Sequence, residues 1–279
     1  MASLQELRKR LRTIQSTGQL AGAMRTAATA KYARLSRVRE DFMPYARACR
    51  EMLSLLGDIG LSREEGKPAA ERDCLVVLCG NRGLCGGFNA ELLRYLDAHL
   101  PEVREPLILA CGKKAAAYLK EHDIPFEDYT VSDVPSFQEV KPLADRLRNA
   151  FTQGEVSRVL VMYQHFRNTL VQIPTMTQLL PGGEEEDESA GEESTLLLLP
   201  DRETIGAQLA MNCLDAQVFE LALESASGAQ AATLMAMRSA CDNAEEYAAN
   251  LEITINRRRQ ADVTSSVIET ASGNVQQGD

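Results

Sequence analysis

The sequence predicts an α/β fold: a long antiparallel coiled coil of N- and C-terminal helices, joined to a Rossmann-like α/β domain with a mostly parallel sheet. First, residues 204–268 contain no proline, and no glycine occurs from residue 229 to 272, so the strongest helix breakers are absent. Second, residues 4–56 repeat apolar side chains at a similar spacing. Third, short apolar runs alternate with helical patterns between these segments, as in a parallel sheet covered by helices. The predicted domains are residues 1–60, 61–203 and 204–279.

The predicted C-terminal helix has one long apolar face. Successive members of this face are three or four residues apart and average near 3.5, the coiled-coil period. They are Leu209, Cys213, Ala216, Phe219, Leu223, Ala226, Leu234, Met237, Cys241, Ala244, Ala248, Leu251 and Ile255, with the polar Gln230 in one position. At ~1.5 Å per residue such a helix would extend about 95 Å. It needs a partner along its length, because a single apolar stripe cannot bury itself.

The N-terminal segment is the predicted partner. Its apolar positions are Leu4, Leu7, Leu11 and Ile14, then Leu20, Met24 and Ala27 in a shifted phase after an interruption at residues 16–18, then Leu35, Val38, Phe42, Tyr45, Cys49, Met52 and Leu56. Pro44 lies inside the last run and should kink the helix or leave one hydrogen bond open. The alternative is two separate amphipathic helices packed on a globule, which the length of the C-terminal helix disfavours.

In the predicted central domain, residues 61–203, the spacing of apolar residues no longer follows the coiled-coil period. Short apolar runs predict buried strands, and amphipathic stretches predict helices between them. The strands are expected at residues 74–79, 107–111 and 158–163, and the helices at 89–100, 113–122 and 137–151. Residues 169–173 and 176–180 alternate around Pro174, which predicts an edge strand, because proline is tolerated there. Residues 196–199 predict one more strand.

Residues 184–193 contain seven acidic side chains, which predicts a solvated, disordered loop. A calcium site is the alternative interpretation, but the run lacks the spaced ligands of an EF-hand loop.

Composition disfavours several classes of protein. No run approaches the ~20 apolar residues of a membrane span. The seven cysteines are scattered without metal or redox spacing, so we expect core residues in a reducing cytosol. Residues 1–50 contain 11 Lys and Arg against 3 Asp and Glu, within a chain of net charge −10. This basic helix lacks interleaved aromatic residues, which favours an acidic protein partner over nucleic acid. An organelle transit peptide is the alternative interpretation of the basic start.

The best candidate for chemistry is the glycine-rich loop, residues 80–89, which follows a predicted strand and precedes a helix. Open α/β sheets bind phosphates at this place. The loop matches neither GxGxxG nor the P-loop pattern, and it has no lysine to reach a phosphate. Its glycines favour a tight turn and close packing, with nucleotide binding as the alternative. The dispersed histidines, which lack metal-ligand spacing, are His99, His122 and His165. We predict no catalytic residue, cofactor or metal site.

Four segments together resemble the gamma subunit of the F-type ATP synthase: STGQLAGAMRTAATAKYARL, NRGLCGGFNAELL, YQHFRNTLVQIPTMTQLLP and LMAMRSACDNAEEYAANLEITINRRRQADVT. The resemblance extends from residue 4 to about residue 270. It implies a central-stalk rotor subunit that transmits torque between the proton-driven c ring and the catalytic alpha/beta hexamer and regulates ATPase activity and proton flow. It further implies contacts with the alpha, beta and epsilon subunits and the c ring, no nucleic acid, no membrane insertion, and a place on the cytoplasmic side of a bacterial plasma membrane.

The same resemblance implies roles for single residues. Contacts with the alpha/beta hexamer are implied for Met24, Arg259, Gln260 and Thr264, and the family's signature positions are Gly83, Gly86, Gly87, Asp242 and Asn243. The sequence departs from the family pattern at Gly18 and Gly22, at Gly228, at Asp262 and in its polar tail. We expect Gly18 and Gly22 to soften the coiled coil or change its hydrogen bonds. The rival functions are a nucleotide-binding enzyme that uses residues 80–89, and a coiled-coil adaptor on a membrane or nucleic acid.

Overall fold

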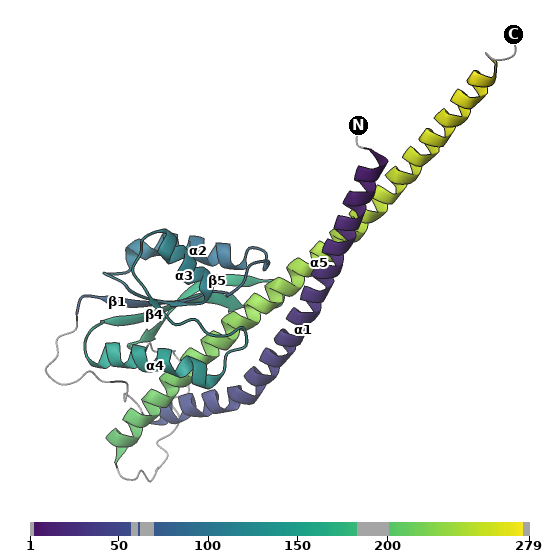
Figure 1. Cartoon of the computed structure of the whole chain (residues 1–279). Helices are drawn as coiled ribbons and strands as arrows, with labels where there is room; N and C mark the ends of the chain where they lie inside the picture. Colours follow the sequence, from purple (N-terminus) through teal and green to yellow (C-terminus); the bar gives the residue numbers. More distant parts are fainter. Residues whose placement is uncertain (1–2, 57–60, 62–69, 183–200, 276–279) are drawn as a thin grey trace. The chain divides into compact units, whose positions relative to one another are not determined.

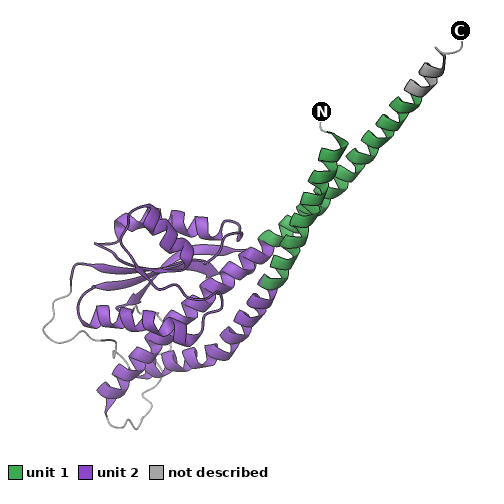
Figure 2. Ribbon diagram, viewed as in Figure 1, with its two compact units in different colours: residues 1–27, 236–279 green, residues 28–235 purple. Residues whose placement is uncertain are grey.

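The computed structural model describes residues 3–56, 61, 70–182 and 201–275. Its elements in chain order are α1 (Leu4–Leu55), β1 (Asp73–Leu78), α2 (Phe88–His99), the 3-10 helix η1 (Leu100–Glu102), β2 (Leu107–Cys111), α3 (Lys113–Glu121), β3 (Glu127–Asp128), α4 (Phe137–Thr152), β4 (Arg158–Phe166), β5 (Gln172–Leu180) and α5 (Arg202–Val275) (Figure 1). The chain forms two compact units (Figure 2). Unit 1 contains residues 1–27 and 236–279, and unit 2 contains residues 28–235. Among the described residues, no helix has the length and apolar character of a membrane span.

Unit 2 contains a five-stranded sheet with the order β3-β2-β1-β4-β5. All neighbouring strands are parallel except β5, which pairs antiparallel with β4 at one edge. Every residue of β1 and β2 is buried, because helices cover both faces of these central strands. Pro174 lies in the edge strand β5, as predicted. The predicted mostly parallel sheet is confirmed, whereas the short polar strand β3 was not expected.

Helices pack on both faces of this sheet. On one face α2 and α3 contribute Leu92, Leu96 and Leu119 to a cluster with Leu75 and Ile108. On the other face α4 packs together with parts of α1 and α5. That larger cluster includes Leu35 from α1, Leu143 and Leu147 from α4, and Leu214, Val218, Phe219 and Leu223 from α5. Segments from both ends of the chain are therefore part of the core of unit 2.

Unit 1 is an antiparallel pair formed by the first part of α1 and the last part of α5 (Figure 2). A Cβ built on Gly18 would lie 3.1 Å from the Cβ of Ala244, and one built on Gly22 would lie 4.0 Å from the Sγ of Cys241. The contacted position in α5 falls as the position in α1 rises, so the two helices run in opposite directions. The predicted antiparallel coiled coil of the terminal helices is confirmed.

The seam of α1 differs from the prediction in two places. Leu20 is 62% exposed and Ala27 is exposed, while Gly18 is half-buried and Ala21 is buried. The expected interruption at residues 16–18 is therefore wrong, because Gly18 continues the apolar repeat instead of breaking it. Small residues occupy the seam where the helices approach closely, and a search for large apolar side chains overlooks them.

In unit 2 the seam of α1 differs from the prediction at two positions after Pro44, while Cys49 and Leu56 are buried as predicted. Tyr45 and Met52 are 46% and 53% exposed, and Ala46 and Leu53 take their place in the buried face. Pro44 itself lies inside α1 and does not end the helix. The predicted acidic loop at residues 184–193 and the predicted strand at 196–199 lie outside the described residues.

Candidate functional site

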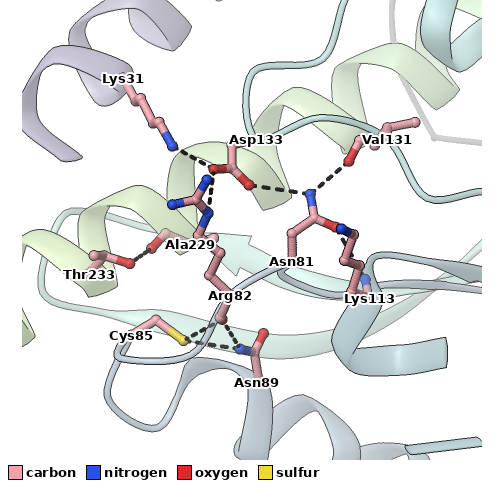
Figure 3. Close-up of polar contacts among 10 residues, drawn as sticks. All are labelled: Lys31, Asn81, Arg82, Cys85, Asn89, Lys113, Val131, Asp133, Ala229 and Thr233. Carbon is pink, nitrogen blue, oxygen red and sulfur yellow. Dashed lines mark hydrogen bonds and ion pairs between the residues drawn. The ribbon is translucent and has the colours of Figure 1, made fainter. Parts of the chain in front are cut away.

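The glycine-rich loop between β1 and α2 is held together by one buried amide, that of Asn89. Its Oδ1 accepts hydrogen bonds from the Gly80 amide at 2.9 Å and from the Cys79 thiol at 3.2 Å. Its Nδ2 donates to the Arg82 carbonyl oxygen at 2.9 Å and to the Cys85 sulfur at 3.1 Å, as Figure 3 shows for the last two partners. This side chain therefore fixes the path of the loop from both ends.

Several backbone amides at the helix starts beside this loop are already occupied by groups of the protein. At the start of α3 the Lys113 amide donates to the side-chain oxygen of Asn81 at 3.1 Å, and the Lys114 amide donates to the Gly80 carbonyl at 3.2 Å. An anion at a helix N-terminus requires free amides. At the start of α2 the Phe88 amide likewise donates to the Cys85 carbonyl at 3.3 Å. The loop is organised for packing within the protein.

Gly112 brings the ends of β1 and β2 together, a role that the sequence did not reveal. Its φ is +111°, in the region that side chains disfavour, and a Cβ there would lie 2.1 Å from the Cys79 carbonyl oxygen. No other residue fits at this place without a backbone shift. The signal in the sequence was its position directly after a buried strand.

The crevice at the carboxyl ends of the parallel strands is largely occupied by α5. Ser225 donates its hydroxyl to the Leu78 carbonyl at 3.0 Å. The buried carboxylate of Glu224 accepts from the Phe166 amide at 2.8 Å and lies 2.8 Å from Nδ1 of His165. The cavity that remains is about 50 Å³, room for a few water molecules. A nucleotide-binding enzyme is therefore not favoured.

The cysteines are small core residues, as predicted. All seven are buried and unpaired by disulfides. Burial raises the pKa of Cys74 and of Cys79 to about 12, and it raises that of Cys213, beside Cys49, to about 12 as well. Such thiols remain protonated near neutral pH and are poor nucleophiles.

The residues with implied partner contacts lie on α1 and α5 in unit 1. Arg259, Gln260 and Thr264 are exposed, and they follow Ile255, which is the last buried residue of α5 among those described. Figure 2 shows that α5 continues past the start of α1 within this unit. Thr264 donates its hydroxyl to the backbone carbonyl of Gln260 at 2.9 Å, one turn earlier in the helix.

The other predicted positions are not gathered at one site. Met24 is half-buried and packs on the cluster of Ala21, Met237 and Cys241. Asp242 and Asn243 are exposed on α5 in unit 1, whereas the three exposed glycines of the loop, Gly83, Gly86 and Gly87, belong to unit 2. The carboxylate of Asp262 lies 3.3 Å from the guanidinium of Arg258.

Comparison with known proteins agrees with this architecture. Residues 3–275 match the family model described as ATP synthase. The ATP synthase gamma chain of Desulforamulus reducens is 31% identical, over 98% of both chains, and that of Roseobacter denitrificans is 33% identical, over 98% of this chain and 99% of the relative. The chain belongs to the ATP synthase gamma chain family.

The predicted resemblance is thereby confirmed along nearly the whole chain. The fold of this gamma chain is similar to that of a chain in the Euglena gracilis mitochondrial ATP synthase, from a structure that contains OSCP, F1 and the c-ring. The TM-score is 0.70 at 20% identity, and the match covers 98% of this chain and 94% of that chain. A second Euglena structure, of the rotor of the same enzyme, gives a TM-score of 0.63 at 20% identity.

Proposed function

We propose that this gamma chain is the central-stalk rotor subunit of an F-type ATP synthase. It transmits torque between the proton-driven c ring and the catalytic alpha/beta hexamer, and it regulates ATP hydrolysis and proton flow. The observation that carries the proposal is the match to gamma chains over nearly the full length, together with a single continuous helix of 74 residues at the C-terminal end. Catalysis belongs to the beta subunits, and this chain supplies no catalytic group.

The terminal helices, within residues 1–60 and 204–279, engage the alpha/beta hexamer, and the central region, residues 61–203, faces epsilon and the c ring. The assembly sits on the cytoplasmic side of a bacterial plasma membrane, to which this chain is peripheral. The occupied amides around the glycine-rich loop and the small cavity beside it support a mechanical role over a nucleotide-binding one.

The proposed contacts with the hexamer are made by Met24, Arg259, Gln260 and Thr264. The end of α5 supports this assignment, because charged and polar side chains stay exposed after the seam ends at Ile255. The guanidinium of an exposed arginine presents N–H donors in a rigid plane, and carboxylate or carbonyl oxygens of a partner can accept these hydrogen bonds in a defined geometry.

Co-expression with alpha and beta chains of one bacterium tests the function. We expect a stable complex with ATPase activity, and we expect Arg259→Ala with Gln260→Ala to weaken coupling between proton movement and ATP turnover without lowering the unfolding midpoint. Arg238→Ala, an exposed arginine of the same helix, is the matched control and should behave as wild type. Failure of the wild-type chain to assemble with alpha and beta would overturn the proposal. Salt-sensitive binding to anionic vesicles or DNA would then favour an adaptor.

A further inference from the structure

One ion pair joins α1 to the loops at the carboxyl edge of the sheet. In unit 2 the ammonium of Lys31 lies 2.5 Å from Oδ2 of Asp133, in the loop that follows β3 (Figure 3). The side chain of Asp133 is 16% exposed, and that of Lys31 is 33% exposed. Charged hydrogen bonds of this kind are directional and stronger than neutral ones, more so when partly shielded from water.

Asp133 is also connected to the glycine-rich loop. The side-chain Nδ2 of Asn81 donates to Oδ1 of Asp133 at 3.3 Å and to the Val131 carbonyl at 2.7 Å. Nε of Arg82 lies 3.4 Å from Oδ2 of Asp133. Asn81 accepts in turn from the Lys113 amide. The contacts therefore run from α1 through Asp133 to the glycine-rich loop and the start of α3.

Several other contacts of α1 in unit 2 are of a different kind. Leu35, Val38 and Phe42 pack in an apolar cluster, and Arg50 pairs with Glu220 of α5 at 2.8 Å. Apolar packing is non-directional, and a pair between two helices does not connect either of them to the sheet. Within the described residues, the Lys31–Asp133 pair is a charged contact between α1 and the α/β domain.

Asp133 is held in its charged form. Burial alone would raise its pKa, but the hydrogen bonds from Lys31 and Asn81 and the charges of Lys31 and Arg82 outweigh it, so the pKa of this carboxyl is lowered. The pair is therefore present at neutral pH.

We propose that Asp133 is a positioning residue that fixes α1 to the α/β domain through Lys31 and Asn81, so that the helix and the domain turn as one body. This inference rests on the proposed rotor function. Open α/β folds bind ligands at the carboxyl edge of the sheet. In this chain the same edge contacts α1 through the Lys31–Asp133 ion pair, and it contacts α5 through hydrogen bonds of Ser225 and Glu224.

The test compares three variants of the full chain in a reconstituted ATP synthase: Asp133→Asn, Lys31→Met and the double change. Asparagine keeps the size of the side chain and can still accept from Asn81, but it loses the ion pair. A charged hydrogen bond contributes about 1.5–3 kcal/mol, so release of α1 from the loop should become about 10- to 100-fold more frequent. Hydrogen exchange of residues 28–35 and 128–135 should accelerate accordingly.

In inverted vesicles we expect each variant to pump fewer protons per ATP hydrolysed, and we expect the double variant to lose no more than either single one. Arg146→Met is the matched control, because Arg146 pairs with Glu127 at 2.9 Å and Glu155 at 2.7 Å wholly inside the α/β domain. It should lower the unfolding midpoint and leave pumping per ATP unchanged.

The outcomes separate this inference from the function on which it rests. If the wild-type chain pumps and Asp133→Asn pumps equally well, the positioning role is wrong while the rotor function stands. Equal losses of pumping in Asp133→Asn and Arg146→Met would overturn it too, because they would reduce the effect to general instability. If the wild-type chain assembles no pumping enzyme, the proposed function itself fails.

Discussion

Alanine substitutions at Gly18 and Gly22 test how closely α1 and α5 approach in unit 1. Each lies inside a helix, where replacement of glycine by alanine gains about 1 kcal/mol of helix stability. At Gly22 the added methyl group would meet nothing nearer than 4.0 Å, so the whole gain should appear. At Gly18 it would lie 3.1 Å from the methyl group of Ala244, closer than ordinary contact. Overpacking costs about 1–3 kcal/mol, so Gly18→Ala should be neutral or destabilising.

The assay is denaturant unfolding of the isolated chain, followed by the helical signal in circular dichroism. Gly22→Ala should raise the free energy of unfolding above that of the wild type. The free energy of unfolding of Gly18→Ala should lie about 1–3 kcal/mol below that of Gly22→Ala. Moving the methyl group across the seam, with Gly18→Ala and Ala244→Gly together, cancels the helix-propensity terms and should restore wild-type stability. Equal stabilisation by alanine at the two glycines would refute the close approach. It would then support the earlier expectation that Gly18 merely softens the helix.

Three further outcomes are expected. Gly112→Ala should destabilise unit 2 by about 3 kcal/mol or more, measured by thermal unfolding, because its methyl group would collide with the Cys79 carbonyl. The buried Asp73 has a pKa lowered below 3.8: burial would raise it, but hydrogen bonds from Arg158 and neighbours outweigh burial. Its stabilising contribution is therefore complete above about pH 4 and is lost as the pH falls through the folded pKa, so wild type should lose more stability than Asp73→Asn in an acid titration. Leu251→Asp should lower the unfolding free energy by about 2 kcal/mol or more, since it places a charge in the seam of unit 1, and an unchanged melting curve would show that this residue lies elsewhere.

The sheet was predictable because burial on both faces leaves a simple trace in the sequence. Residues 107–111 form β2 at the predicted bounds, and β1 begins one residue before its predicted start at Cys74. The additional residue, Asp73, is polar and does not extend the apolar run, yet it is fully buried and pairs with Arg158. Strand β3 has two polar residues, so no local pattern marks it.

The positions in the helix seam were less predictable, for a physical reason. A regular alternation of three and four residues places Tyr45 and Met52 in the seam, whereas the structure places Ala46 and Leu53 there. At Ala46 a small residue is buried beside the larger, exposed Tyr45, so side-chain size misleads there. The period was correct, but the phase depended on contacts with a segment that lies far away in the sequence.

The contacts at the carboxyl edge of the sheet could not be predicted from the sequence. Lys31 and Asp133 are separated by 102 positions, and each taken alone resembles an ordinary surface charge. The glycine-rich loop was recognised, and its structural interpretation was preferred, but only the structure shows that Asn89 and Asn81 occupy the hydrogen-bonding groups that a phosphate would need.

Gly228 shows why the occupied crevice matters for the helix itself. A glycine inside a helix costs about 1 kcal/mol relative to alanine, and α5 would be expected to avoid that cost. A Cβ at this position would lie 3.0 Å from the ring of Phe88, the first residue of α2. Together with the hydrogen bond from Ser225 to Leu78, this contact places the backbone of α5 close against the end of β1. The helix thus gives up intrinsic stability at the point where it contacts the domain, which is where a shaft that carries torque needs its firmest attachment.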